Sequence, residues 1–178
     1  MTQPLDHVAE FAVTETDRQQ IIDLLAGAFR TDFGGRSYFI QPPTSRILAR
    51  GKDGNIVGQL GLFHRHIRLG AQDIRIVGFG DVAVRDNHRG HGVGGTLVQA
   101  GLGVAQKVGV PFVLLEGDSG IYDRHGFRPM SNPIRYAVVK DGVGTTVAIA
   151  ADIPLMVCAM ADEPWPENVQ LDLFGPRF

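Results

Sequence analysis

Residues 82–97 read VAVRDNHRGHGVGGTL, and the interpretation of the whole chain starts from this stretch. A short apolar segment and a polar loop are followed by Gly90, Gly92, Gly94 and Gly95, and then by an apolar run of helical spacing. Glycines allow positive φ angles and let a ligand come close to the backbone. The first amides of a helix lack partners within it, and the helix dipole adds partial positive charge there. The stretch therefore predicts an anion site suited to a pyrophosphate.

The same loop also matches the G-x-G-x-x-G pattern of dinucleotide-binding folds, with Glu116 about 20 residues further on. In that fold the first glycine directly follows its strand, whereas here a polar loop separates Val84 from Gly90. Hairpin strands also precede the loop, where a mostly parallel sheet would be needed. A nucleotide-dependent oxidoreductase is thus a disfavoured alternative, as is a glycine-rich connector without a ligand. A P-loop is excluded because no Gly-Lys-Ser/Thr follows.

The segments on both sides of the loop predict a mixed sheet. A helix is expected from a cap at Thr14 or Thr16 to about Phe33, where Gly34 and Gly35 end it. Three strands then form an antiparallel meander, and the strand after the glycine-loop helix is expected to pair in parallel through a right-handed crossover. The expected strands are 45–50, 55–69, 73–84, 110–115, 134–139 and 146–159, with a short helix at 120–125 and an aperiodic tail at 161–178.

Composition narrows the function classes. The chain has 178 residues, 44% of them hydrophobic, and a net charge of −2, which predicts a single domain over residues 1–178 and disfavours nucleic acid as a partner. One cysteine, Cys158, excludes an internal disulfide and favours a reducing, cytoplasmic location. Neither a signal peptide nor a membrane-spanning run is apparent. His64 and His66 have no third ligand nearby in sequence, so no metal site is expected.

Two motifs resemble those of the GCN5-related N-acetyltransferase (GNAT) superfamily. Val82–Val84, followed after a short loop by Arg89–Gly94, resembles its Arg/Gln-x-x-Gly-x-Gly/Ala segment, and Tyr122–Phe127 resembles its Tyr-x-x-x-Gly-Phe segment. The order of elements is similar over nearly the whole chain. The resemblance implies an α/β (α+β) fold, with a mostly antiparallel mixed sheet, a central splayed pair of parallel strands and flanking helices.

The resemblance also implies an acetyl-CoA-dependent N-acetyltransferase acting in a ternary complex, with no metal. The acceptor amine attacks the thioester directly, and Tyr122 is the general acid that protonates the CoA thiolate. Loop amides would hold the pyrophosphate, and main-chain groups before the loop would pair with the pantetheine. The residues implied for acetyl-CoA are Val82, Ala83, Val84, Arg89, Gly90, His91, Gly92, Val93, Gly94, Gly95 and Thr96.

A closer likeness concerns the acceptor. Thr16–Phe33 is similar to the first helix of aminoglycoside 2'-N-acetyltransferases, while NodA-like acyltransferases resemble the chain in the hairpin, the glycine loop and a Trp-Pro tail. The first likeness implies antibiotic inactivation at the 2'-amine of an aminoglycoside, usually a deoxystreptamine type, and a homodimer. The missing acid at Gly80 suggests a different aminoglycoside, and kasugamycin is one candidate. The second implies a longer acyl donor. A non-catalytic acyl-CoA-binding sensor is a third possibility.

Acidic groups are expected around a polycationic acceptor. The closer likeness implies Asp32 and the terminal carboxylate of Phe178, in a tail near the acceptor site, and Glu116 and Asp118 are added from their place beside a strand end.

The general base stays open at this point. Related enzymes often carry a carboxylate at the position of Gly80, which this chain lacks. Asp81 is adjacent, but strand alternation directs it to the other face unless a bulge intervenes. Glu116 and Asp118 are alternatives acting through water. Each of these three acids is expected to be a substrate contact or a loop-capping acid rather than the base, so Asp81 is counted among the residues that contact the acceptor.

Overall fold

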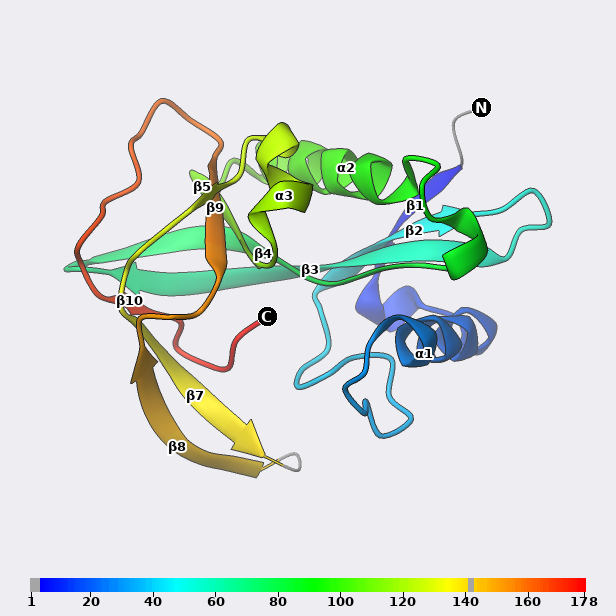
Figure 1. Cartoon of the computed structure of the whole chain (residues 1–178), viewed down its shortest axis with the longest axis horizontal. Coiled ribbons are helices and arrows are strands. Elements are labelled where there is room, and N and C mark those ends of the chain that lie inside the picture. Colours follow the sequence, from blue (N-terminus) through cyan, green and yellow to red (C-terminus); the bar gives the residue numbers. More distant parts are fainter. Residues whose placement is uncertain (1–3, 141–142) are drawn as a thin grey trace. The chain divides into compact units, whose positions relative to one another are not determined.

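The computed structural model describes residues 4–140 and 143–178. The strands are β1 (Leu5–Ala9), β2 (Ser45–Arg50), β3 (Ile56–Leu69), β4 (Gln72–Val84), β5 (Phe112–Glu116), β6 (Arg128–Pro129), β7 (Ile134–Lys140), β8 (Val143–Ala150), β9 (Leu155–Ala159) and β10 (Leu171–Asp172). The α-helices are α1 (Glu15–Ala28), α2 (Val93–Val108) and α3 (Ser119–Tyr122), and single 3-10 turns are η1 (Glu10–Ala12), η2 (Asp86–His88) and η3 (Asp123–His125) (Figure 1).

These strands form a mixed sheet with helices at its flanks, as the sequence predicts. The strand order is β6-β9-β5-β4-β3-β10-β7-β8, and β2 additionally pairs with β3 and with β1. β10 runs parallel to β7, whereas β1–β2, β2–β3, β5–β9 and β7–β8 are antiparallel pairs. The chain divides into two compact units, Met1–Phe63 with Phe79–Gly103 and His64–Gly78 with Val104–Phe178, and each is described by itself.

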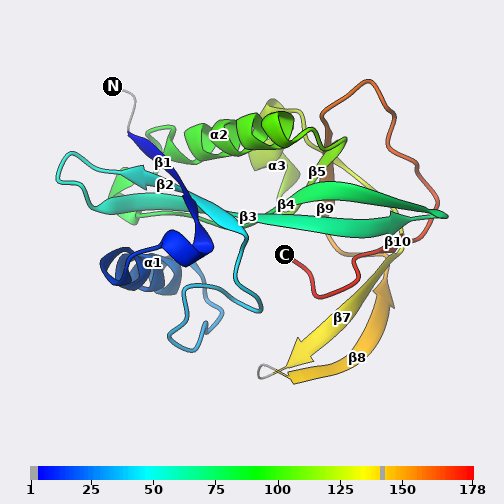
Figure 2. The ribbon, with the colours of Figure 1, turned by 180° about the vertical axis from the view of Figure 1, so that it is seen from behind.

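The first unit contains the glycine loop. α1 covers one face of its sheet and the start of α2 the other, and β1 lies alongside β2 (Figure 2). The side chains of one apolar core fill the α1 face: Val13, Ile21, Leu24, Leu25, Phe33, Leu48, Ile56 and Ala83. The strand β1 was not expected from the sequence, because its five residues show no alternation strong enough to distinguish a strand.

α1 begins where the sequence predicts and ends earlier. The Thr14 hydroxyl accepts a hydrogen bond from the Asp17 amide at 3.1 Å, which confirms Thr14 as the cap. The prediction that the helix reaches Phe33 is wrong, because Phe29 already has an extended backbone. Phe29, Phe33 and Phe39 instead form a row of ring contacts with centroids 5.6 Å apart, which folds residues 29–44 into a loop.

The second unit packs around strands β5 and β9 and carries the β7–β8 hairpin (Figure 1). Trp165 is buried, and its ring contacts Phe112 edge-on with centroids 5.0 Å apart, so this residue packs the tail against β5. The predicted strand 146–159 is wrong as one element, because it is divided into β8 and β9. Pro154 lies in the break and cannot donate to a strand ladder. None of the described helices is long and apolar enough to cross a membrane.

Candidate functional site

The glycine loop leads into α2, whose first turn leaves three main-chain amides without a partner inside the helix. Gly90 and Gly92 have φ angles of 75° and 81°, a conformation that a side chain would strain. α2 begins at Val93, and the Thr96 amide is the first to donate within it, to the Gly92 carbonyl at 3.0 Å. The amides of residues 93–95 therefore point out of the helix N-terminus, where the dipole favours an anion.

The side chains of the loop are held by local bonds. Arg89 Nε donates to the Val84 carbonyl at 3.1 Å, and its guanidinium lies 3.0 Å from the Asp86 carboxylate. His91 Nδ1 lies 2.7 Å from the Arg89 carbonyl. The Arg89 side chain is half exposed, so its charge remains at the mouth of the loop and available to an incoming anion.

Two glycines let α2 lie close to the sheet of its unit. At Gly58 on β3, a β-carbon would lie 3.1 Å from the Ala83 carbonyl and from the Val93 side chain. At Gly101 on α2, a β-carbon would lie 2.6 Å from the Phe79 ring. Because neither β-carbon exists, the helix rests directly on β3 and β4, and its first turn meets the end of β4.

That end of β4 carries the three residues expected to contact pantetheine. Ala83 is buried in the core of its unit, whereas Val82 and Val84 are partly exposed. The Arg85 amide donates to the Val57 carbonyl at 2.9 Å, so β4 is pinned to β3 just beyond Val84.

Asp81 sits at an irregular point of β4. Its φ angle is 51°, in the left-handed region that residues other than glycine adopt rarely, so strand alternation is broken there. Burial raises the pKa of the Asp81 carboxyl to about 6. The Arg46 charge and a hydrogen bond from the Phe39 main chain lower this pKa, and the Glu10 charge raises it further.

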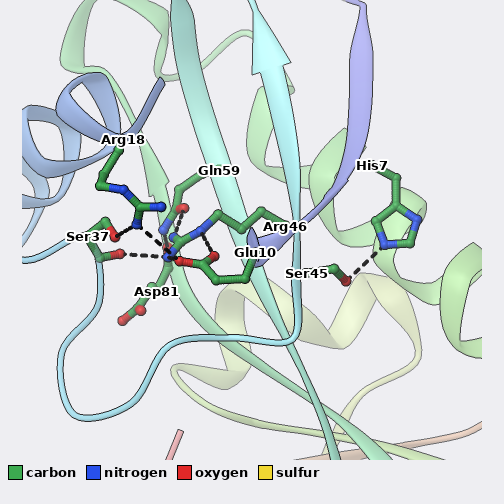
Figure 3. A network of polar contacts seen from close by, with 8 residues as sticks. All are labelled: His7, Glu10, Arg18, Ser37, Ser45, Arg46, Gln59 and Asp81. Atoms are coloured by element: carbon green, nitrogen blue, oxygen red, sulfur yellow. Dashed lines mark hydrogen bonds and ion pairs between the residues drawn. The ribbon is translucent and has the colours of Figure 1, made fainter. Parts of the chain in front are cut away.

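A buried polar network lies beside Asp81 (Figure 3). The Arg46 side chain is completely buried, and its guanidinium forms a two-pronged ion pair with Glu10, at 2.6 Å and 3.1 Å. Gln59 belongs to the same network and is also fully buried. In Figure 3 the Asp81 carboxylate is directed away from Arg46 and Gln59. The network therefore contacts the main chain of Asp81 and leaves its carboxylate for other partners.

None of these network residues is predicted by a sequence motif. Glu10 lies in a 3-10 turn with no recognisable motif, whereas Arg46 and Gln59 are polar residues inside otherwise apolar strands. A buried arginine is tolerated only when it is paired. Arg46 in the apolar run SRILAR could therefore have indicated a buried acidic partner.

Asp32 lies in the loop after α1. Its carboxylate accepts a hydrogen bond from the Gly34 amide at 2.7 Å and is exposed, so it closes a turn of the loop. It also lines a small cavity of about 220 Å³ together with Arg36 and Phe29.

Tyr122 belongs to the second unit. It is the last residue of α3, so the short helix predicted at 120–125 is observed as α3 followed by η3. Its ring packs on Gly117 and contacts Phe127 edge-on, with centroids 6.0 Å apart. Burial raises the pKa of the Tyr122 phenol, so the hydroxyl stays protonated at neutral pH.

Two further expected acids lie near Tyr122 in the chain. Glu116 ends β5 and is partly buried, and its carboxylate accepts a hydrogen bond from Arg177 at 3.0 Å. Burial raises the pKa of Glu116 and the Arg177 charge lowers it. Asp118 is exposed and accepts a hydrogen bond from the Gly120 amide at 2.9 Å. Glu116 is thus a paired acid, and Asp118 caps the turn before α3.

Phe178 is held within the second unit by two contacts of its ring and by one hydrogen bond to the nearby residue Pro176. Its ring lies against Gly78, where a β-carbon would collide with it. The Arg65 guanidinium lies over the same ring, 4.9 Å from its centroid, and Arg65 Nη1 donates to the Pro176 carbonyl at 2.6 Å. Burial lowers the pKa of Arg65 to about 10, so this cation is still charged at neutral pH.

The expected residues thus divide between the units. The glycine loop, Val82–Val84, Asp81 and Asp32 belong to the first, and Tyr122 with the remaining acids and Phe178 belongs to the second. Within the described part of the chain, no three His, Cys, Asp or Glu residues are grouped as a metal site.

Comparison with known proteins points to one family. The family model described as the acetyltransferase (GNAT) domain matches residues 12–130, more than half of the chain. No curated protein sequence matches the chain.

Solved structures give the same indication for the fold. A GNAT family N-acetyltransferase, YhbS from Escherichia coli in complex with CoA, is 20% identical with a TM-score of 0.67, over 97% of this chain and 91% of that chain. A GNAT family acetyltransferase from Brucella melitensis in complex with acetyl-CoA is 19% identical with a TM-score of 0.63, over 95% and 96%. Escherichia coli ElaA is 17% identical with a TM-score of 0.61, over 88% and 99%.

Proposed function

Because this chain belongs to the GNAT acetyltransferase family, we propose that it transfers the acetyl group of acetyl-CoA to a primary amine of a small polar acceptor. The observation that carries the proposal is the first turn of α2, where a glycine-shaped loop presents the amides of residues 93–95 at a helix N-terminus. Such a turn suits a diphosphate, and CoA carries one. We also propose that the two units together form one acyltransferase domain.

In this proposal most contacts to acetyl-CoA come from main-chain groups, and few come from side chains. The diphosphate accepts hydrogen bonds from the amides of residues 93–95, and Arg89 adds charge at the mouth of the loop. The main chain of Val82–Val84 pairs with the pantetheine like an added strand. One amide of this segment polarises the thioester carbonyl, as in an oxyanion hole.

The reaction needs one proton acceptor and one proton donor. Asp81 removes a proton from the acceptor ammonium group, and the neutral amine then attacks the thioester carbon. The C–N bond forms, the C–S bond breaks, and the CoA thiolate leaves with a proton from Tyr122. The attacking nitrogen then loses its second proton to the Tyr122 phenolate, which leaves a neutral amide and restores the phenol. A carboxyl with a pKa of about 6 is largely ionised at neutral pH and basic enough to accept the proton, which favours Asp81 over the exposed Asp118.

For the acceptor we propose an aminoglycoside, modified at its 2'-amine. Its several ammonium groups call for several carboxylates, and Asp32, Glu116 and Asp118 are the candidates. Support comes from the likeness of residues 16–33 to the first helix of aminoglycoside 2'-N-acetyltransferases. Kasugamycin and a deoxystreptamine aminoglycoside are therefore the first acceptors to test.

The test is release of free CoA thiol from acetyl-CoA with a panel of amines, followed by mass spectrometry of the products. We expect an acceptor mass increased by one acetyl group, and a fall in kcat of about a hundredfold or more for Tyr122→Phe with acetyl-CoA affinity retained. A product only with longer acyl donors would favour the NodA-like alternative. Acetyl-CoA binding without release for any amine would favour a sensor and contradict the proposal.

A further inference from the structure

Arg46 is a charged side chain buried completely in the first unit, and the acetyl-transfer mechanism above gives it no role. A buried cation is tolerated only when it is paired and its donors are satisfied. Glu10 supplies the opposite charge through both carboxylate oxygens. That leaves the remaining guanidinium hydrogens free to organise other groups, and they do so along two paths, one to the main chain of Asp81 and one to the loop after α1.

The first path runs through Gln59 to the main chain of Asp81. Arg46 Nη1 donates to the amide oxygen of Gln59 at 2.6 Å, and Gln59 Nε2 donates to the Asp81 carbonyl at 2.8 Å. A glutamine amide has one oxygen that accepts and one nitrogen that donates. Because Arg46 occupies the oxygen, the nitrogen must face Asp81.

The second path runs to the loop after α1. Arg46 Nη2 donates to the Ser37 carbonyl at 2.9 Å, which ties this loop to β2. Phe39, whose main chain lowers the pKa of the Asp81 carboxyl, follows two residues later in the same loop. Arg46 thereby fixes a loop that lies beside the carboxylate of Asp81, as well as the glutamine that holds its carbonyl.

We propose that Arg46 and Gln59 are positioning residues that hold Asp81 in its left-handed backbone conformation, with the carboxylate aimed for proton transfer. This rests on the proposed function, in which Asp81 is the proton acceptor. A left-handed aspartate persists only where its surroundings over-determine it, and the hydrogen bond from Gln59 holds the main chain of Asp81. Misplacing a catalytic group by about 1 Å costs about a hundredfold in rate, so loss of the Gln59 contact lowers the rate.

The test compares variants of the network with a matched control. Gln59→Met keeps the length of the side chain and removes the donor to Asp81. Gln59→Glu keeps the acceptor for Arg46 and removes the same donor, so it serves if the methionine variant does not fold. Arg50→Met is the control, because Arg50 lies on the same strand as Arg46 and pairs with Asp6 and Asp17 at 2.6 Å and 2.9 Å.

We expect kcat of both Gln59 variants to fall by up to about a hundredfold, with KM for acetyl-CoA unchanged. In Gln59→Glu the rise of activity with pH moves to higher pH, because a second carboxylate then lies beside Asp81. Arg50→Met lowers the thermal midpoint without moving kcat or the pH profile. A folded Gln59 variant with the kcat and pH profile of the wild type would overturn the positioning role.

A measurement without turnover separates this inference from the proposed function. Carbon-13 NMR follows the titration of the Asp81 carboxyl, assigned by its disappearance in Asp81→Asn. We expect its midpoint to rise in Gln59→Glu and to stay in place in Arg50→Met. If the wild type acetylates no amine, the proposed function fails, and an unmoved Asp81 midpoint in Gln59→Glu would independently reject the network.

Discussion

The ring of Tyr122 lies against Gly117, so close that a β-carbon on Gly117 would come within 2.6 Å of the ring Cε2 atom. Gly117 follows β5 and Tyr122 ends α3, so a missing side chain at the end of a strand determines where the phenol can lie. Real β-carbons do not approach other atoms this closely, and an added methyl group must therefore move the ring.

Gly117→Ala should lower kcat by about tenfold to a hundredfold, because the displaced phenol no longer reaches the leaving thiolate. The affinity for acetyl-CoA should change little, since Gly117 lies outside the glycine loop. Steady-state kinetics with acetyl-CoA and the best acceptor measure both quantities. Gly103→Ala is the control, since its β-carbon would enter open space and should leave kcat unaltered. Wild-type kcat in Gly117→Ala would mean that the position of Tyr122 does not matter.

Replacing either of two glycines of α2 by alanine should change the free energy of unfolding, in opposite directions at the two positions. At Gly101 a β-carbon would lie 2.6 Å from the Phe79 ring and 2.7 Å from Leu60, so Gly101→Ala should lower the free energy of unfolding by about 1–3 kcal/mol. At Gly103 nothing lies within 4 Å, so Gly103→Ala should raise it by about 0.5–1 kcal/mol. Urea denaturation gives both values. Equal effects at the two sites would contradict the close packing of α2.

The difference in stability between Asp81→Asn and the wild type should depend on pH. Folding raises the pKa of Asp81 from 3.8 to about 6, so the native state holds a proton that the unfolded chain releases between these values. The stability that this proton contributes is complete below pH 3.8 and is lost as pH rises through about 6. Above pH 6 the wild type therefore carries the cost of a buried charge.

Asparagine has no charge to bury and tolerates the left-handed conformation well. Asp81→Asn should therefore be more stable than the wild type above pH 6, by at most about 3 kcal/mol, with the difference vanishing near pH 4. Acetyl transfer should be lost at every pH. Denaturation at a series of pH values and an activity assay check both expectations. A constant stability difference would show that Asp81 titrates normally.

Where local chemistry dominates, the sequence predicted the fold well. The residues of β2 match the expected strand at 45–50, and Thr14 caps α1 because a hydroxyl before a helix satisfies a first-turn amide. The failures occur where the structure depends on contacts between side chains or strands. α1 ends at Ala28, and the rings of Phe29, Phe33 and Phe39 pack together in the loop beyond it. β1 pairs with β2, which lies far away in the sequence.

The glycine loop is the part of the candidate site that could be predicted from the sequence, because it is formed by glycines and main-chain amides. Gly90 and Gly92 must adopt positive φ angles, and a pattern of glycines reveals this directly. The left-handed angle of Asp81 has no such signature, because the residue that contacts its main chain, Gln59, lies far away in the sequence. Tertiary contacts of this kind cannot be read from a single strand.

The first turn of α2 is proposed to hold the diphosphate of CoA, and a negative charge placed in that turn tests this proposal. Gly94 lies among the amides proposed to hold the diphosphate, and a β-carbon there would meet only Val84, at 3.8 Å. Gly94→Asp therefore fits, and its carboxylate should stabilise the helix through the dipole while repelling a phosphate. Gly94→Asn is the comparison of equal size without the charge.

The decisive measurement is calorimetric titration of acetyl-CoA into the wild type and these two variants at low salt. We expect the wild type to bind and Gly94→Asp to bind at least about tenfold more weakly than Gly94→Asn, with the difference shrinking as salt screens the charges. No binding of acetyl-CoA to the wild type, or equal Kd values for the aspartate and asparagine variants, would contradict the claim that this turn holds the diphosphate of CoA.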